Sequence, residues 1–355
     1  MPDSRFSVAA RVIAQAVQTR AFPAAVVEVG GSTRPFWRQA FGRLTCDDRA
    51  PGTTDDTIFD LASLTKVLAT TALVMQQVER GALGLDDRVG EHIADWKGPD
   101  RAGVTVRDLL THCSGLPGGY IPLFRELAGR AAFEAAICGT PLEYPPRSRS
   151  VYSDLDFILL GFMLEGERSL PARFEALRAQ MGIIDDLQFH PPAAWKPRTA
   201  PTEIDPWRGR LLVGEVHDEN AAALGGAAGH AGLFGTAAAV GEHARHVLQI
   251  LDGKTGACTR GTVASFIARR TDVPGSSRAL GWDTMLPSSS SGSRMSPRAF
   301  GHTGFTGTSL WIDPDRGVYV VLLTNRVHPS RANEAIRQVR PAFHDAVMEA
   351  LAAAD

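Results

Sequence analysis

Residues 309–325 read SLWIDPDRGVYVVLLTN and carry the clearest structural pattern in this chain. Two apolar runs, 309–313 and 318–325, lie on either side of the turn sequence Pro-Asp-Arg-Gly. Runs of β-branched, leucine and aromatic residues around such a turn are typical of two paired strands. The segment therefore predicts a strand pair near the C-terminus. A helix is expected from about Arg331, with Pro341 as a kink.

The N-terminal part carries a matching pattern. Residues 23–31 (PAAVVEVGG) and 34–42 (RPFWRQAFG) are rich in apolar and aromatic side chains, and a glycine turn separates them. This arrangement predicts a second hairpin. In the residues before it, arginine and glutamine interrupt the apolar positions, which favours an amphipathic helix over a signal peptide. Because both ends of the chain carry strands, we expect one antiparallel sheet built from both, with helices against it.

Helical patterns dominate the region between the hairpins. Residues 61–81, LASLTKVLATTALVMQQVERG, place apolar side chains at helical spacing and end at a glycine. Thr105 is followed three residues later by Asp108, which is the order of a capping box at a helix start. No clear strand pattern occurs over residues 85–235. That range is therefore expected to be helical and rich in loops.

The length of 355 residues exceeds one minimal domain and suits two lobes that share a cleft. We expect an α+β fold in which residues 1–84 and 236–355 form a discontinuous sheet domain. Residues 85–235 are expected to form an inserted helical lobe. The cleft between the two is the expected position of an active site.

The charge balance restricts the partners. The chain carries 37 lysines and arginines against 39 aspartates and glutamates, a net charge of −2, so it has no excess of cations for nucleic acid or an anionic membrane. No run of about 20 apolar residues is present, so no membrane span is expected. The four cysteines lack CxxC spacing and are expected to be free thiols. We expect a small-molecule substrate and a cytoplasmic protein, or a periplasmic or secreted one if a leader has been removed; the oligomeric state stays open.

Ser63 and Lys66 form the first chemical motif, Ser-Leu-Thr-Lys, near the start of the helix over 61–81. Residues three apart share one face of a helix, so the amine can take the serine proton or influence its charge. Lys66 is one of four lysines in the chain. The alternative is a helix-start serine beside a lysine that extends into solvent. The apolar neighbours of Lys66 argue against full exposure.

Two further segments place polar residues at turns. Residues 152–154 (Tyr-Ser-Asp) precede an apolar helical pattern, and residues 302–304 (His-Thr-Gly) lead into a strand between glycines that let a ligand approach the backbone. Taken alone, each is also explained as an ordinary helix cap or glycine-rich turn. The literal Lys-Thr-Gly at 254–256 lies between two helical patterns with no strand after it, so 302–304 is the better match.

These three motifs occur in the order Ser-x-x-Lys, Tyr-x-(Asn-like) and (Lys/His)-Thr-Gly. The chain thereby resembles the penicillin-recognising serine hydrolases, most closely the class C β-lactamases, the DD-carboxypeptidases and their esterase relatives. The resemblance extends over nearly the whole chain. It is supported by the phrases LLTHCSGLP (109–117), YSDLDFILLG (152–161), LGGAAGHAGLFGTA (224–237) and LLTNRVHP (322–329).

The resemblance implies a role for each matching residue. Ser63 matches the nucleophile that forms an acyl-enzyme, Lys66 its partner on the same helix, and Tyr152 the phenol that exchanges protons with nucleophile and leaving group. A phenol near an ammonium is expected to have its anionic form favoured, so that the two act as one unit. The backbone N–H groups of Ser63 and Phe305 match the oxyanion hole.

The implied substrate-binding residues are Asp154, His302, Thr303 and Gly304. Relatives commonly carry asparagine where this chain has Asp154, and many carry lysine where it has His302. A carboxylate cannot donate to the amide carbonyl of a penicillin or peptide, so we expect short-chain esters to be better substrates than β-lactams. His302 is expected to make activity depend on pH near neutrality.

Other histidines receive simpler interpretations. His217, Asp218 and His230 flank the glycine-rich run 225–232 and are candidates to support the site from behind. His243 and His246 share a helix face, but no carboxylate or cysteine set completes a metal site around them. No cofactor and no metal are expected.

Three substrate classes remain open for an acyl-enzyme hydrolase: a β-lactam, a D-Ala-D-Ala-like peptide and a carboxylic ester. The alternative from another class is a catalytically silent protein that binds a ligand or a peptidoglycan fragment. The presence of Ser63, Lys66 and Tyr152 argues against a protein without catalytic activity. An α/β-hydrolase is excluded because no G-x-S-x-G occurs in the chain.

Overall fold

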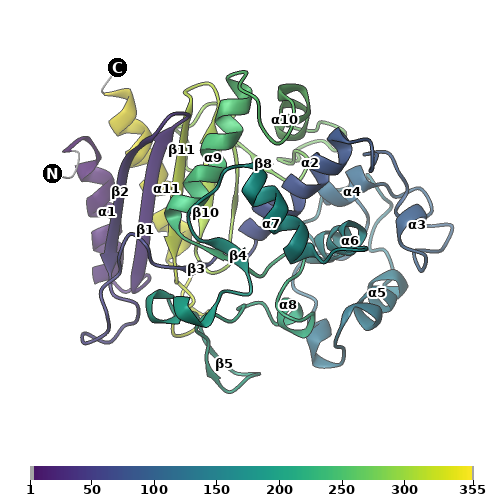
Figure 1. Ribbon diagram of the computed structural model, residues 1–355, viewed down its shortest axis with the longest axis horizontal. Coiled ribbons are helices and arrows are strands. Elements are labelled where there is room, and N and C mark those ends of the chain that lie inside the picture. The colour runs from purple at the N-terminus through teal and green to yellow at the C-terminus, as the bar shows by residue number, and fades with distance from the viewer. Residues whose placement is uncertain (1–3, 354–355) are drawn as a thin grey trace.

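A six-stranded antiparallel sheet runs through one side of the protein (Figure 1), as seen in a computed structural model that describes residues 4–353. Its strand order is β2-β1-β11-β10-β9-β8, so the first two strands of the chain pair with the last ones. The strands are β1 (Ala24–Gly31), β2 (Pro35–Gly42), β8 (Asp283–Thr284), β9 (Phe300–Thr303), β10 (Ser309–Asp313) and β11 (Val318–Thr324). The predicted sheet from both chain ends is confirmed.

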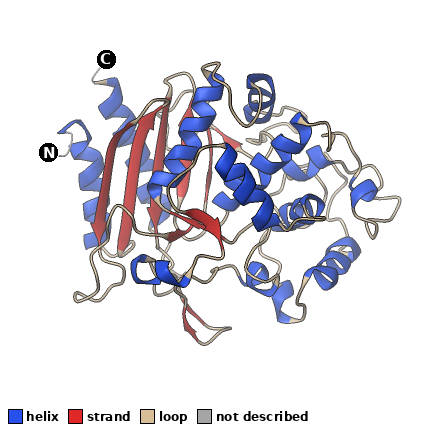
Figure 2. Ribbon diagram, viewed as in Figure 1, coloured by secondary structure: helices blue, strands red, loops and turns tan. Residues whose placement is uncertain are grey.

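Helices cover both faces of this sheet, and Figure 2 shows the three layers. Alternate residues of β1 enter different cores: Val26 packs with residues of α9 (Ala237–Leu251), and Val27 packs with residues of α1 (Ser7–Gln18) and α11 (Ile336–Ala352). Side chains of a strand alternate between its faces, so a strand covered on both sides is apolar except where a buried polar group is paired, as Glu28 is here. All eight residues of β1 are buried accordingly.

Shorter helices fill the other side of the protein. Lys66–Thr71 (η2) is a π-helical segment that continues into α2 (Ala72–Glu79), so the helix predicted over 61–81 is present but its first turns are wider than expected. The other helices are η1 (Ser4–Phe6), α3 (Val89–His92), α4 (Val106–Leu110), η3 (Leu123–Arg125), α5 (Arg130–Gly139), α6 (Asp154–Leu164), α7 (Leu170–Gln180), η4 (Ala193–Arg198), α8 (Glu219–Ala223) and α10 (Arg260–Ile267).

Four short strands interrupt the region over 85–235, where no strand was expected. They are β4 (Leu187–Phe189), β5 (Ile204–Asp205), β6 (Arg210–Leu211) and β7 (Leu233–Gly235); β7 pairs with β4 and with β3 (Phe59–Asp60), and β5 pairs with β6. Strands of two or three residues are too short to show an alternating pattern. In the chain, β3 ends shortly before Ser63, and its pairing with β7 holds this end in the short sheet.

Two helices begin at positions that can be compared with the sequence predictions. Thr105 forms the predicted capping box, because the Asp108 carboxylate accepts from the Thr105 N–H at 2.8 Å and the Thr105 hydroxyl accepts from the Asp108 N–H. The last helix begins at Ile336 rather than near Arg331, whose backbone and side chain are held by Glu203 in a loop. No helix within residues 4–353 is both long and apolar enough to cross a membrane.

Candidate active site

Ser63 lies at the turn between β3 and the helix that carries Lys66. One helical turn separates the two, and Lys66 Nζ donates to Ser63 Oγ at 3.0 Å. Tyr152 lies two residues before the start of α6, and its hydroxyl donates to the same oxygen at 3.0 Å. Segments 89 residues apart in the chain therefore meet at one serine oxygen. The structure brings together the three residues that the sequence predicted as catalytic.

The ammonium of Lys66 is fully buried and fully paired. Besides Ser63 Oγ, it donates to Asp154 Oδ1 at 2.7 Å and to the His230 carbonyl at 3.2 Å, which uses its three protons. Burial lowers the pKa of Lys66, but the Asp154 carboxylate and the Tyr152 phenol outweigh burial and raise it. Lys66 is consequently held as a cation in the resting site.

Tyr152 is also neutral in the resting site. Burial is the largest influence and raises the pKa of its phenol; Lys66 opposes this, and Asp154 adds to it. The neighbouring ammonium favours a phenolate, as expected, but burial outweighs its effect in the resting state. Ser63 Oγ accepts two hydrogen bonds, and a base appears only when the Lys66–Tyr152 pair loses a proton.

The residues 302–304 end β9 beside Ser63. His302 is buried, its ring lies 5.9 Å from that of Tyr152, and its Nδ1 donates to the Thr303 carbonyl at 2.8 Å. Burial, Lys66 and Arg278 hold the pKa of His302 well below its usual value. Its imidazole stays neutral near pH 7, so the expected titration of His302 near neutrality is wrong.

Gly304 allows the strand end to approach the serine turn. A Cβ at this position would lie 2.1 Å from Thr308 Oγ1 and 2.6 Å from the Leu61 carbonyl oxygen. Both contacts are far shorter than van der Waals distance, so only glycine fits. Within the described part of the chain, nothing accepts a hydrogen bond from the backbone N–H of Ser63 or of Phe305. These two donors match the expected oxyanion hole.

His217, Asp218 and His230 lie around the site in different ways. The His217 ring stacks on the Phe305 ring with centroids 5.7 Å apart, and its backbone N–H donates to Asp60 Oδ2 at 2.6 Å. His230 Nε2 donates to Asp218 Oδ1 at 2.9 Å, and the carbonyl of His230 accepts from Lys66. Burial would raise the pKa of Asp218, but His230 lowers it to about 2.

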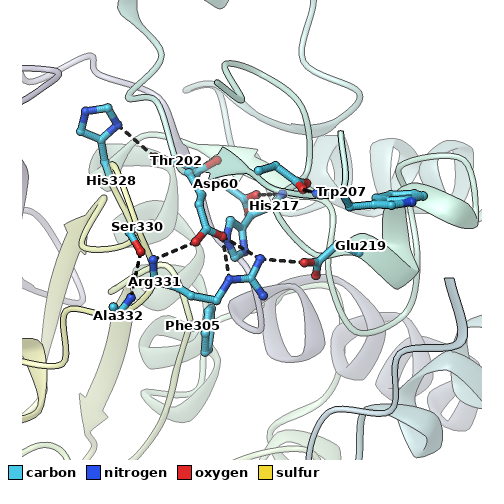
Figure 3. A network of polar contacts seen from close by, with 12 residues as sticks. Asp60, Thr202, Trp207, His217, Glu219, Phe305, His328, Ser330, Arg331 and Ala332 are labelled. Carbon is cyan, nitrogen blue, oxygen red and sulfur yellow. Dashed lines mark hydrogen bonds and ion pairs between the residues drawn. The ribbon is translucent and has the colours of Figure 1, made fainter. Parts of the chain in front are cut away.

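An ion-pair network that the sequence did not predict adjoins His217 (Figure 3). Arg331 donates to Glu203 and to Glu219, each at 2.6 Å, and His217 Nε2 donates to Glu203 at 2.9 Å. Tyr120 donates to the other oxygen of Glu219 at 2.6 Å. These residues come from four separate segments. Only His217 was a candidate from the sequence; Tyr120, Glu203, Glu219 and Arg331 stand in no motif, so no local signal pointed to them.

A cleft of about 580 Å³ lies beside Ser63, and its lining holds as many carboxylates as arginines. Five arginines line it: Arg278, Arg326, Arg331, Arg337 and Arg340. Arg340, on α11, is 8% exposed and donates only to the Thr308 carbonyl at 3.2 Å; its Nε has no partner among the described residues. Burial and then Arg326 lower its pKa to about 10, so it still carries its charge at neutral pH. A buried cation without a counter-ion is costly, so an anion bound in the cleft would stabilise it.

A family model described as "Beta-lactamase" matches residues 9–342. A relative from Salmonella agona (strain SL483) is named "Putative D-alanyl-D-alanine carboxypeptidase". It is 31% identical over an alignment of 326 residues, and the match covers 80% of this chain and 72% of that protein. A penicillin-binding protein homologue from Caulobacter crescentus has a TM-score of 0.74 at 21% identity, covering 99% of this chain and 98% of that chain. EstCE1, a hydrolase with promiscuous acyltransferase activity, has a TM-score of 0.74 at 21% identity, over 96% and 98%. These two likenesses establish a shared fold.

Proposed function

Since the chain belongs to the beta-lactamase family and is a serine hydrolase, we propose that Ser63 is its nucleophile and that its substrate is an acyl compound whose leaving group ends in a carboxylate. The first part depends on one observation: Lys66 Nζ and the Tyr152 hydroxyl each lie 3.0 Å from Ser63 Oγ. The second part depends on Arg340. It also agrees with the names of the relatives, since a D-alanyl-D-alanine peptide ends in a carboxylate.

Acylation starts from the form of the site that has lost one proton. Because Asp154 holds Lys66 as an ammonium, the proton is missing from Tyr152. The phenolate accepts the Ser63 proton as Oγ attacks the carbonyl carbon, and the oxyanion is stabilised by the N–H groups of Ser63 and Phe305. The phenol then donates its proton to the departing nitrogen or oxygen. Ser63 remains acylated and Tyr152 is again a phenolate.

Hydrolysis of the acyl-enzyme repeats these steps with water. The Tyr152 phenolate takes a proton from water, whose oxygen attacks the acyl carbon. When the second tetrahedral intermediate collapses, Tyr152 returns the proton to Ser63 Oγ, and the acid product leaves. Lys66 keeps its charge throughout and stabilises the phenolate electrostatically.

A Ser63→Ala variant tests the nucleophile. We expect it to lose hydrolysis of every substrate while it stays folded, because alanine removes the hydroxyl and favours the helix start. Intact-mass spectrometry after incubation with penicillin and with an activated ester should show a covalent adduct on the wild type only. Residual turnover within about tenfold of wild type would exclude Ser63 as nucleophile. Absence of any wild-type adduct would favour the silent binding protein.

An Arg340→Gln variant tests the carboxylate. The paired substrates are an acyl-D-alanyl-D-alanine peptide and the same peptide with a C-terminal amide. We expect Arg340→Gln to raise KM for the acid by about tenfold or more, since a charge-assisted hydrogen bond is lost, and to leave the amide unaffected. Arg337→Gln is the matched control, because Arg337 lines the same cleft but is exposed and paired with Glu334. Equal effects on acid and amide would contradict the assignment.

A carboxylic ester is the second candidate substrate, and Asp154 is the observation that favours it. The carboxylate of Asp154 accepts from Lys66 and has no proton to offer an amide carbonyl. An ester whose alcohol part carries a carboxylate needs no hydrogen bond from Asp154, and its carboxylate can pair with Arg340. Hydrolysis of such an ester faster than of the peptide would select this candidate.

A further inference from the structure

His112 lies in the turn after α4, in the segment LLTHCSGLP, and is held in an unusual backbone conformation. Its φ is +56°, a left-handed value that is uncommon outside glycine, although histidine adopts it more often than most residues, as asparagine and aspartate do. Such strain is found where surrounding contacts fix the residue. Several contacts of His112 lead to the tripeptide centred on Tyr152, and another leads to Asp156.

Three interactions join His112 to that tripeptide. The His112 carbonyl accepts from the Val151 N–H at 2.9 Å, and its Nδ1 accepts from the Ser153 N–H at 3.2 Å. Its ring packs against the ring of Tyr152, with centroids 4.7 Å apart. One residue therefore holds the backbone on both sides of Tyr152 and one side of its phenol ring.

The hydrogen bonds at Nδ1 indicate where the protons lie, although the Nε2–H that they imply has no acceptor among the described residues. A backbone N–H can only donate, so His112 Nδ1 must carry a lone pair for Ser153. Asp156 Oδ2 lies 3.0 Å from the same Nδ1, and two acceptors cannot bind each other. Asp156 must therefore carry a proton on Oδ2. Its Oδ1 accepts from Ser114 Oγ at 2.5 Å, and that hydroxyl accepts from the Leu116 N–H.

The surroundings agree with a neutral pair. Both side chains are buried; burial raises the pKa of Asp156 well above its usual value and lowers that of His112 well below it. The cations that face His112 are Arg278, Lys66 and, if protonated, His302, and each opposes a second positive charge there. Asp156 faces Asp108 and Asp154, which oppose its ionisation, and Lys66, which favours it less strongly.

We infer that His112, as the Nε2–H tautomer held by a protonated Asp156, is a positioning residue that fixes the phenol of Tyr152 against Ser63. The inference rests on the proposed function in one respect, that Tyr152 transfers the proton. Neither His112 nor Asp156 lines the cleft, so the pair can act on the site only through Tyr152, against which the His112 ring packs. Displacement of a proton-transfer group by about 1 Å is enough to cost on the order of 10²-fold in rate.

The first test reads the tautomer without any substrate. Nitrogen-15 NMR of the histidine rings, with His112 assigned by its loss in His112→Asn, should show a protonated Nε2 and an unprotonated Nδ1 that do not change between about pH 5.5 and 8.5. A protonated Nδ1, or a titration of His112 within this range, would overturn the inference.

The second test reads the proton on Asp156. Its pKa is higher in the folded protein than in the unfolded chain, so its contribution to stability is complete at acidic pH and falls as pH rises. Asp156→Asn keeps a donor for His112 and an acceptor for Ser114 but never ionises. We expect it to unfold at a higher temperature than wild type at pH 8, with the difference shrinking towards pH 5. A variant less stable than wild type at pH 8 would mean that Asp156 is ionised.

The third test reads the position of Tyr152 through the rate. We expect His112→Ala to lower kcat by about 10²-fold with KM changed by less than about threefold, since the phenol and not the substrate is misplaced. His112→Asn, which tolerates the left-handed backbone and can accept from Ser153, should recover part of this loss. His243→Leu is the matched control, because His243 is equally buried on α9 and does not line the cleft.

The outcomes separate the two hypotheses. If His112→Ala and His112→Asn both keep wild-type kcat, the positioning role is wrong and the proposed function stands. If Tyr152→Phe keeps wild-type activity, the proposed function fails, whereas the tautomer and the Asp156→Asn stability are read independently of it. If His112→Ala does not fold, the comparison of His112→Asn with wild type decides, with a loss in kcat at constant KM as the supporting result.

Discussion

Asp154 favours the protonated form of both groups that contact Ser63 Oγ. It accepts from Lys66 at 2.7 Å and raises the pKa of Lys66; for Tyr152, burial raises the pKa most and Asp154 adds to it. Burial and this carboxylate together keep the resting site in its fully protonated form. The base form must be reached by loss of a proton to solvent, so the rate of acylation should increase with pH.

Replacing Asp154 with asparagine should shift this pH dependence. Without the carboxylate, the Lys66–Tyr152 pair loses its proton more readily, so the ascending limb of the kcat/KM profile moves to lower pH. The ratio of kcat/KM for nitrocefin to that for a p-nitrophenyl ester should also rise, by about 1–2 kcal/mol for one hydrogen bond regained by the amide. A shift of the limb to higher pH, or faster wild-type turnover of nitrocefin than of the ester, would contradict this account.

Lys66 and Tyr152 should act as one unit. We expect Lys66→Ala and Tyr152→Phe each to lower kcat by about 10²-fold or more, and the double variant to lose much less than the product of the two. The physical reason is that the phenolate needs the ammonium, and the ammonium has no role without the phenolate. Steady-state kinetics of the four proteins on one ester measure the coupling. Strictly multiplicative losses would show that the two residues work independently.

Ser63 and Lys66 could be predicted from local geometry, because they are three residues apart on one helix. Tyr152, 89 residues from Ser63, was predicted only from the order of the motifs and the resemblance that they carry. Arg340 and His112 have no comparable signal: Arg340 contacts Thr308, 32 residues away, and His112 contacts Asp156, 44 residues away. Burial cannot be read from spacing, which is why the pKa expectation for His302 failed and why the effect of Lys66 on Tyr152 is outweighed.

At the level of elements, one buried ion-pair cluster fixes α9 against the sheet. Glu28 on β1 is fully buried and accepts from Arg38, Arg245 and Tyr319 at 2.6, 3.0 and 2.6 Å. Gly241 on α9 lies directly over it, and a Cβ there would be 1.9 Å from Glu28 Oε1. Glu28 cannot move aside without leaving its partners, so the helix approaches the strand only through a glycine.

Gly241→Ala should therefore destabilise the protein although alanine favours helices. We expect a loss of about 1–3 kcal/mol in the free energy of unfolding, as is usual for overpacking a fixed core. Gly261→Ala on α10 is the matched control, because its Cβ would meet nothing closer than 3.8 Å, and we expect it to add about 0.5–1 kcal/mol. Urea unfolding at pH 7 measures both. Equal effects of the two substitutions would mean that Glu28 and its partners shift to make room for the added Cβ.

Element prediction succeeded where a run was long enough to show its period. The strands β1, β2, β10 and β11 have five to eight residues and were placed correctly. The two helical patterns on either side of residues 254–256 were also placed correctly and are α9 and α10. The two- and three-residue strands β3 to β7 were not, because their pairing is imposed by the chain around them. The start of α11 was misplaced by five residues because Arg331 is held by distant carboxylates.

For the whole molecule, buried histidines make stability depend on pH. His243 and His344 are fully buried, and burial lowers the pKa of each to about 3. The unfolded chain takes up protons on these rings below about pH 6.5, whereas the folded protein does so only near pH 3. Acid therefore favours the unfolded chain across this window.

His243→Leu should flatten that dependence. We expect wild type to lose about 1.4 kcal/mol of stability per pH unit below pH 6 for each such histidine, and the variant to lose one histidine's share less. Urea unfolding at pH 7, 5.5 and 4.5 gives the slopes. Parallel slopes for the two proteins would show that His243 is charged in the folded state.

The pairing of β1 with β11 also has a consequence for how the chain reaches its fold. The backbone N–H of Ala24 donates to Asn325 Oδ1, a partner 301 residues later in the sequence. Contacts of such separation fold slowly, because a long loop must close before they form. One edge of β1 therefore has no partner until β11 is in place. The central sheet is thus completed late in folding rather than early.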